Sequence, residues 1–155
     1  MRKKQNYKRE RKPDMKHGSV VIGRFINYLM QDGKKSTAEK IMYNTFEKIQ
    51  KDTKEDPVKV FEKAMENAAP AVETATRRVG GANYQVPVEV RADRRFILAA
   101  RWIIGAARGK KGKPMASKLA EEFILASKNE GAAIKKKLDM HRMAEAKRAF
   151  AHFSW

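Results

Sequence analysis

The feature of this sequence that most restricts its fold is a single change of hydrophobic period. Over residues 72–79 and 83–91 apolar and polar residues alternate, which predicts two β-strands. One face of the second run carries Tyr84, Val86, Val88 and Val90. Gly80-Gly81 lies between the runs, and glycine adopts the positive φ angles of a tight hairpin turn without steric cost. The sequence therefore predicts one two-stranded hairpin at about residues 72–90.

Helical periodicity occupies the sequence on both sides of this hairpin, because apolar residues recur there at spacings of three and four. The expected helix starts are Ser19, the capping box Ser36–Glu39, Asp56-Pro57, Asp93, Pro114 and Ala132. The expected ends include Gln31 for the first helix, Arg108 for the fourth and Phe150 for the sixth. The predicted fold class is mainly α, a single domain of six helices with one protruding two-stranded β-hairpin between the third and fourth helices.

Net charge is the second strong constraint. The 155 residues include 35 Lys and Arg against 18 Asp and Glu, a formal net charge of +17. Such a surplus repels itself in the free protein, so it is typical of a chain that binds a polyanion. The chain has no Cys, which excludes disulfides and cysteine-ligated zinc. No apolar run approaches the roughly 18 residues of a membrane-spanning helix, so we expect a cytoplasmic protein.

The positive charge is unevenly distributed. Residues 37–73 hold six Lys and eight acids, whereas the segments around them are basic. This pattern predicts that one face of the protein binds a polyanion and that another faces solvent. Residues 1–17 are interpreted as a basic N-terminal arm that becomes ordered on binding, with a solvated tail as the alternative. Residues 18–155 would form the nucleic-acid-binding domain. The basic side chains of the arm that we expect to contact nucleic acid include Arg2, Lys3, Lys4, Arg9, Arg11 and Lys12.

A row of arginines on the predicted fourth helix is the clearest candidate binding feature. Arg94, Arg101 and Arg108 recur every seven residues and therefore lie on one helix face. A solvated face usually mixes charges of both signs, and here Asp93 is the only acid nearby in the sequence. Guanidinium groups match phosphate oxygens with two parallel hydrogen bonds. We therefore favour nucleic-acid contact over simple solvent exposure.

The loop after this helix is also basic. It carries Lys110, Lys111 and Lys113, and no acid occurs in residues 108–118. The backbone amides and lysine charges of such a loop bind phosphate. An ordinary solvated loop has the same composition, and we prefer phosphate contact because acids are absent.

The tip of the predicted hairpin offers different groups. Arg77 and Arg78 precede the turn, and Asn83, Tyr84 and Gln85 follow it. Two arginines, an aromatic ring and two amides suit contact with unpaired nucleotides. The alternative is an edge ribbon kept soluble by charge. Because no partner for the hairpin is visible elsewhere in the sequence, we favour contact with a ligand.

Groups for catalysis are not apparent. His17, His141 and His152 are the only histidines, and none has a second His at metal-ligand spacing. The run Gly33-Lys34-Lys35-Ser36 resembles the end of a phosphate-binding loop, but Tyr28 stands where that motif needs glycine. The sequence therefore predicts a binding protein without cofactor or metal, and not an enzyme.

Several long motifs resemble one known family. They are Asp32–Glu39, Arg77–Gly81, Tyr84–Arg91, Arg101-Trp102, His141–Ala146 and Ala149–His152. From about residue 13 to the C-terminus, the chain is similar to the family of bacterial small-subunit ribosomal protein seven. Residues 1–12 are basic, as in that family, without a matching motif.

The resemblance implies a structural constituent of the small ribosomal subunit, with six helices and an extended hairpin. It implies a primary binder of ribosomal RNA, at its large 3′ domain, that nucleates assembly of the subunit head. Further implied partners are exit-site transfer RNA, messenger RNA and neighbouring proteins of the head and platform.

These implications and the charge pattern together define two sets of expected contact residues. Beyond the arm, ribosomal RNA is expected at Lys34, Lys35, Arg91, Arg94, Arg95, Arg101, Arg108, Lys110, Lys111 and Lys113. Transfer RNA or messenger RNA is expected near Arg77, Arg78, Gly80, Gly81, Asn83, Tyr84, Lys135, Lys136 and Arg142.

Three other interpretations compete with this one. A DNA architectural protein also combines a basic helical body with a β-ribbon arm, but such arms usually carry an apolar wedge where this sequence has Gly80-Gly81-Ala82. An RNA-modifying enzyme needs a cofactor loop or a catalytic cluster. A membrane-surface protein would have to expose an apolar helix face to lipid, whereas the apolar faces of these helices are needed to pack against one another.

Overall fold

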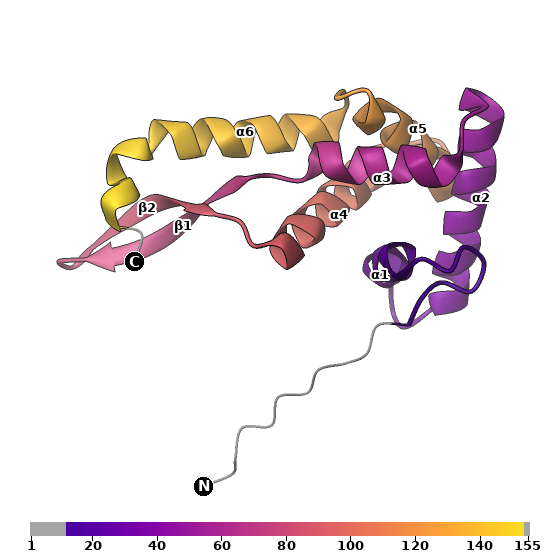
Figure 1. Ribbon diagram of the computed structural model, residues 1–155, viewed down its shortest axis with the longest axis horizontal. Coiled ribbons are helices and arrows are strands. Elements are labelled where there is room, and N and C mark those ends of the chain that lie inside the picture. Colours follow the sequence, from indigo (N-terminus) through magenta and orange to yellow (C-terminus); the bar gives the residue numbers. More distant parts are fainter. Residues whose placement is uncertain (1–11, 154–155) are drawn as a thin grey trace, which may run out of the picture. The chain divides into compact units, whose positions relative to one another are not determined.

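The computed structural model describes residues 12–153, and this part of the chain forms six α-helices and one two-stranded sheet (Figure 1). The helices are α1 (Val20–Leu29), α2 (Lys35–Thr53), α3 (Pro57–Ala68), α4 (Ala92–Gly109), α5 (Met115–Ser127) and α6 (Ala132–Ala146). The strands are β1 (Val72–Val79) and β2 (Ala82–Glu89), and a 3-10 helix, η1 (Arg148–Phe153), follows α6. The predicted fold class is confirmed, with the hairpin between the third and fourth helices.

The chain divides into two compact units after residue 40, within α2. In the first unit, a turn precedes α1 and buries Asp14. The carboxylate of Asp14 accepts hydrogen bonds from two backbone amides of this turn, which offsets the cost of its burial. A Cβ at Gly23 would lie 3.0 Å from the carbonyl oxygen of residue 12, so glycine permits this close approach. The described part of the predicted arm is therefore folded, and residues 1–11 lie outside the described residues.

The first two helices differ from expectation at their ends. Helix α1 ends at Leu29, two residues early, and Ser19 occupies its N-cap without a side-chain hydrogen bond. The predicted capping box is wrong, because α2 begins at Lys35 and Ser36 already lies inside the helix. Glu39 pairs instead with Lys35, one turn away, at 3.7 Å between Nζ and Oε1.

Later boundaries include one confirmed start and two corrections. Asp56 caps α3 as predicted, because its side chain accepts a hydrogen bond at 3.0 Å from the backbone amide two residues on. Helix α4 begins at Ala92, so Asp93 lies in the first turn, where its charge complements the helix dipole, and not at the N-cap. Helix α6 ends four residues before Phe150, and the chain continues as η1.

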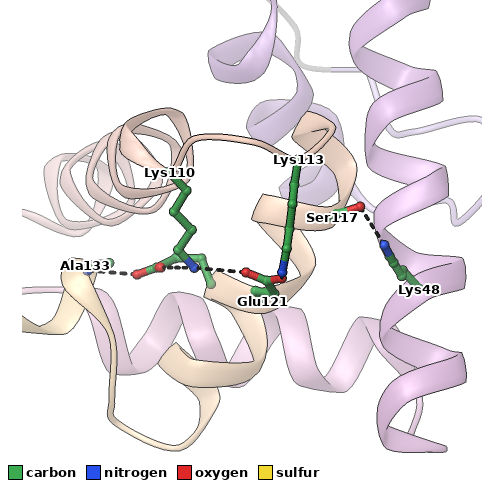
Figure 2. Close-up of polar contacts among 7 residues, drawn as sticks. Lys48, Lys110, Lys113, Ser117, Glu121 and Ala133 are labelled. Carbon is green, nitrogen blue, oxygen red and sulfur yellow. Dashed lines mark hydrogen bonds and ion pairs between the residues drawn. The ribbon is translucent and has the colours of Figure 1, made fainter.

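Aromatic packing forms the core of the second unit. Phe61 of α3 meets Phe46 of α2 and Phe123 of α5 edge to face, with ring centroids 6.0 and 5.4 Å apart. All three rings are buried, and burying one such side chain contributes about 1.5–3 kcal/mol. Lys48 of α2 also donates a 2.6 Å hydrogen bond to Ser117 of α5 (Figure 2). Helices α2, α3 and α5 therefore share one aromatic core, and α3 leads directly into the hairpin.

The hairpin has the predicted register and turn. β1 and β2 pair antiparallel from Val72–Glu89 at the base to Val79–Ala82 at the turn. Gly80 and Gly81 have φ angles of +57° and +89°, which residues with a Cβ atom adopt only with strain. Val86 is buried on the apolar face of β2, as the alternating pattern predicts.

The hairpin is not a free arm. Helix α6 contacts β1, and η1 contacts β2 (Figure 1). The interpretation that the hairpin lacks a partner within the chain is therefore wrong. Alternation in a strand marks which face is covered, but it does not tell which distant segment covers it.

Candidate nucleic-acid interface

The arginine row on α4 is exposed, as its spacing predicts. Arg94, Arg101 and Arg108 all face solvent. Arg94 is nevertheless partnered, because its Nε lies 3.3 Å from Oε2 of Glu73 in β1 while its side chain stays 47% exposed. Arg101 forms no ion pair with any residue of the described range 12–153. The expectation that Asp93 is the only acid near this face missed Glu73, which is far away in the sequence.

The basic loop, residues 110–113, is not free of acids in three dimensions. Nζ of Lys110 lies 3.0 Å from Oε2 of Glu122 and 3.8 Å from Oε2 of Glu121, both on α5. Lys113 pairs with Glu121 (Figure 2). This hydrogen bond to Lys113 is the main reason why the pKa of Glu121 lies below its ordinary value. Residues 108–118 contain no acid, as the sequence shows, but α5 brings two acids to the loop, so that absence does not support phosphate contact by Lys110 and Lys113.

Lys111 differs from its two neighbours in the loop. It is exposed, and within the described part of the chain it forms no ion pair. It is followed by Gly112, whose φ of +81° supports the sharp change of direction there. Of the three predicted lysines, Lys111 is thus the one whose charge is directed only toward solvent.

Glu122 is a residue that sequence analysis missed. Its side chain is 1% exposed, and its Oε1 accepts a 3.0 Å hydrogen bond from the backbone amide of Ala133 at the start of α6. A Cβ at Gly131, the N-cap of α6, would lie 2.9 Å from this same oxygen. The signal was present, because Glu122 falls on the apolar stripe between Leu119 and Phe123. A charged residue on such a stripe indicates a buried partner.

The hairpin tip presents arginines without acids. Arg77 and Arg78 are exposed, and neither pairs with an acid among the described residues. Asn83 lies opposite Arg78 in the register and is exposed too, as are the two turn glycines. Tyr84 is half-buried, with its ring 5.4 Å from that of Phe150. The aromatic ring expected to contact nucleotides therefore already packs, at a tilt of 46°, on a ring of the C-terminal segment.

Helix α6 divides its basic residues between solvent and the fold. Lys135, Lys136 and Arg142 are exposed, as predicted. Lys137, which was not predicted, donates a 2.7 Å hydrogen bond to the backbone carbonyl of Asn67 in the last turn of α3. Burial, aided by a nearby arginine, lowers the pKa of Lys137.

A histidine joins α6 to the base of the hairpin. Nε2 of His141 accepts a 3.2 Å hydrogen bond from the backbone amide of Ala71, directly before β1. Burial and, second, the charge of Lys137 lower the pKa of His141, which keeps the ring neutral and able to accept. Neither contact has a local signal in the sequence, since the partners are 70 residues apart.

The remaining predicted residues lie in several places. Arg91 and Arg95 are exposed around the start of α4. Lys34 and Lys35 are exposed at the start of α2 and belong to the first unit, as does the exposed Lys12. The other arm residues, Arg2, Lys3, Lys4, Arg9 and Arg11, lie outside the described residues.

The described residues also bear on metal binding and membrane insertion. Within residues 12–153, no three His, Asp or Glu side chains gather in a way that would hold a metal ion. In the same range, no helix combines the length and the apolar character needed to cross a membrane.

The chain is similar to known proteins along nearly its whole length. The profile of the family described as ribosomal protein S7p/S5e matches residues 1–148. Small ribosomal subunit protein uS7 of Thermotoga maritima is 56% identical over 155 residues, all of both chains. The protein of that name from Endomicrobium trichonymphae is 59% identical over 143 residues, 92% of this chain and 90% of its own. Full-length identity at this level and a profile match over nearly the whole chain show that this protein belongs to the ribosomal protein S7p/S5e family.

Proposed function

We propose that this protein is a primary ribosomal-RNA anchor that nucleates assembly of the head of the small subunit. Its body would bind the large 3′ domain of the RNA, with neighbouring proteins of the head and platform beside it. Its hairpin would lie near exit-site transfer RNA and the path of messenger RNA. The chain would thus have two contact regions with different ligands.

Family membership carries the coarser part of this function. A member of the S7p/S5e family is a structural constituent of the small ribosomal subunit, and not an enzyme. The expected location on the ribosome, a cytoplasmic particle in bacteria, follows from the same membership. Binding of ribosomal RNA agrees with the net charge of +17, because a polyanion offsets the self-repulsion of such a chain.

The observation that best supports RNA contact by the body is the α4 face. Arg101 projects from the middle of a helix whose other side is buried, and no described residue neutralises it. The planar guanidinium fork matches phosphate oxygens with two parallel hydrogen bonds, so an exposed arginine on this face is suited to bind phosphate. Lys111 in the adjacent loop adds a second charge directed to solvent. Phosphate contacts of this kind would dominate affinity, and RNA shape would supply specificity.

The hairpin tip supports a ligand separate from the main RNA site. Arg77 and Arg78 lie next to a two-glycine turn at the far end of the ribbon from its base on the helices. DNA-bending arms place a large apolar residue between base pairs, whereas this tip carries two glycines and Ala82. The tip is therefore better suited to backbone and single-strand contacts than to wedging a duplex.

The decisive experiment is binding to a fragment of the large 3′ domain of small-subunit ribosomal RNA. The complex is titrated with salt and challenged with excess duplex DNA. We expect tight binding that survives the DNA and falls steeply as salt rises. If excess duplex DNA displaces the RNA from the protein, specific RNA anchoring is overturned, and an architectural DNA protein is favoured.

A further inference from the structure

The carboxylate of Glu122 joins two segments that flank the α4 face. Oε2 faces Nζ of Lys110, the C-cap residue of α4, at 3.0 Å. Oε1 accepts the amide of Ala133 in the first turn of α6. Figure 2 shows this chain of contacts running from the loop, through α5, to the beginning of α6. One buried side chain thus connects the basic loop with a different helix.

Stability alone does not account for a buried charge at this position. Removing a carboxylate and an ammonium group from water costs several kcal/mol per ion, and well-packed apolar residues often stabilise a core equally well. The ion pair instead fixes where Lys110 lies: Oε2 of Glu122 accepts no hydrogen bond from the described residues, and its attraction for Nζ of Lys110, 3.0 Å away, is strong because the acid is buried. The side chain of Glu122 is 1% exposed and that of Lys110 is 29% exposed, so solvent screens this pair only from the lysine side.

The two acids of α5 hold the loop at both ends. Glu122 engages Lys110, the first loop residue, and Glu121 engages Lys113, the last. Lys111 and Gly112 lie between these two points, and both are exposed. The loop is therefore pinned mainly at Lys110, by the buried acid, and more weakly at Lys113, whose pair with Glu121 is exposed. Its unpaired lysine lies between these two points and faces outward.

We propose that Glu122 is a positioning residue for RNA binding, which acts through Lys110 to hold loop 110–113 so that Lys111 meets a phosphate. This inference rests on the proposed function, because it requires that the loop contact RNA. It also assigns Lys110 a different role from the one predicted from the sequence. Lys110 is a structural partner of the acid, and Lys111 is the phosphate ligand of the loop.

The sign of the effect of Glu122→Gln separates positioning from simple electrostatics. The change raises the net charge by one, and long-range attraction alone then predicts tighter binding of RNA. Glutamine can still accept the amide of Ala133, but it no longer attracts Lys110. Loss of the loop geometry predicts weaker binding, by about fivefold. Glu62→Gln, at an exposed site on α3, makes the same charge change and is the matched control.

The experiment measures affinity and salt dependence for the 3′-domain RNA fragment with the full-length chain. Circular dichroism establishes a temperature at which every variant is fully folded. We expect E122Q to bind about fivefold more weakly than E62Q. We expect K110Q to weaken binding without changing the slope of log affinity against log salt. Lys111→Gln should reduce that slope by about one, as the loss of one phosphate contact requires.

A double variant tests whether the two residues act through one contact. K110Q and E122Q both break the same ion pair, so the double change should weaken binding no more than the stronger single change does. Additive losses, or a lower salt slope for K110Q, would overturn the positioning role, because Lys110 would then contact phosphate itself. If E122Q does not fold, the K110Q result carries the same test.

The failure of this inference differs from the failure of the proposed function. If K111Q lowers the salt slope while E122Q binds as tightly as E62Q, positioning by Glu122 is overturned and loop contact stands. If K111Q changes neither affinity nor slope, the loop does not contact phosphate, and the positioning role falls with it. Specific RNA anchoring by the rest of the body is then judged separately, by the challenge of the wild-type complex with duplex DNA.

Discussion

The basic loop 110–113 and the hairpin tip are both positively charged, but among the described residues most basic side chains of the loop are paired with acids and those of the tip are not. In the loop, Lys110 and Lys113 are held by carboxylates of α5. At the tip, Arg77 and Arg78 face solvent without an ion pair to any residue in the range 12–153. The number of basic residues in a segment therefore does not measure the charge that a ligand meets. That charge depends on acids brought in from elsewhere in the fold.

The same contrast separates a preorganised contact from an adaptable one. A loop pinned at both ends loses little conformational freedom on binding, so it suits a ligand of fixed shape such as a folded RNA domain. Unpaired arginines at a ribbon tip keep their rotamers until they meet a ligand. They suit a less regular ligand, such as a single strand.

Removing the buried acid should produce the largest change in stability. Glu122→Ala leaves Lys110 without its nearest partner and the amide of Ala133 without an acceptor, and we expect the free energy of unfolding to fall by about 3 kcal/mol. Arg77→Ala at the tip should change it by less than about 0.5 kcal/mol. Urea denaturation followed by circular dichroism measures both. Equal denaturation midpoints for the two variants would contradict the expectation that the buried, paired acid stabilises the fold more than the exposed, unpaired arginine does.

The next effect concerns the cover on the hairpin. Phe150→Ala removes the ring that packs on Tyr84, and we expect a loss of about 1 kcal/mol together with faster amide hydrogen exchange in β2. Arg148→Ala is the control on the same segment, since its pair with Glu145 is largely exposed. Unchanged exchange in the Phe150 variant would mean that the ribbon does not depend on its C-terminal cover.

The base of the hairpin should respond to pH through His141. Its folded pKa lies below the ordinary value of 6.5, so the unfolded chain binds the proton more readily. The stabilising contribution is therefore complete above that value and is lost as pH falls from it through the folded pKa. A protonated ring cannot accept from Ala71 and also repels Lys137, with Arg95 close to that lysine.

Unfolding midpoints measured from about pH 8 down to about pH 5 test this expectation. His141→Gln should flatten the decline in this range. Glu121, whose pKa is also lowered, contributes stability that is lost only as pH falls below its ordinary value of 4.5. A decline of equal steepness in the His141 variant would assign the effect to other groups.

The smallest effect on stability is expected at the tip itself. The double change Arg77→Gln and Arg78→Gln should alter the free energy of unfolding by less than about 0.5 kcal/mol. It should leave binding to the 3′-domain RNA unchanged but weaken crosslinking of assembled small subunits to transfer RNA or messenger RNA. Loss of the primary RNA binding in this variant would contradict the division between body and hairpin.

Local patterns in the sequence were enough to predict the elements and to place several residues of the candidate site on exposed faces. Apolar spacing identified six helices, alternation identified the ribbon, and Gly80-Gly81 identified its turn, because each depends on neighbours along the chain. Heptad spacing placed Arg94, Arg101 and Arg108 on an exposed face for the same reason. Helix ends were less well predicted. Ser36 carries a capping side chain, yet α2 begins one residue earlier.

Which of these charges can meet a ligand depends on long-range packing. Glu73 reaches Arg94, Glu122 reaches Lys110, and His141 reaches the hairpin base across long stretches of sequence. Such pairings follow from how helices and strands pack, and periodicity in one segment contains no information about them. The hydrophobic period, the position of the turn and the sign of the charge can all be read from the sequence, because each is a local property of the chain. Packing determined which basic groups are held within the fold and which face solvent, because burial and ion pairing depend on distances that only folding establishes.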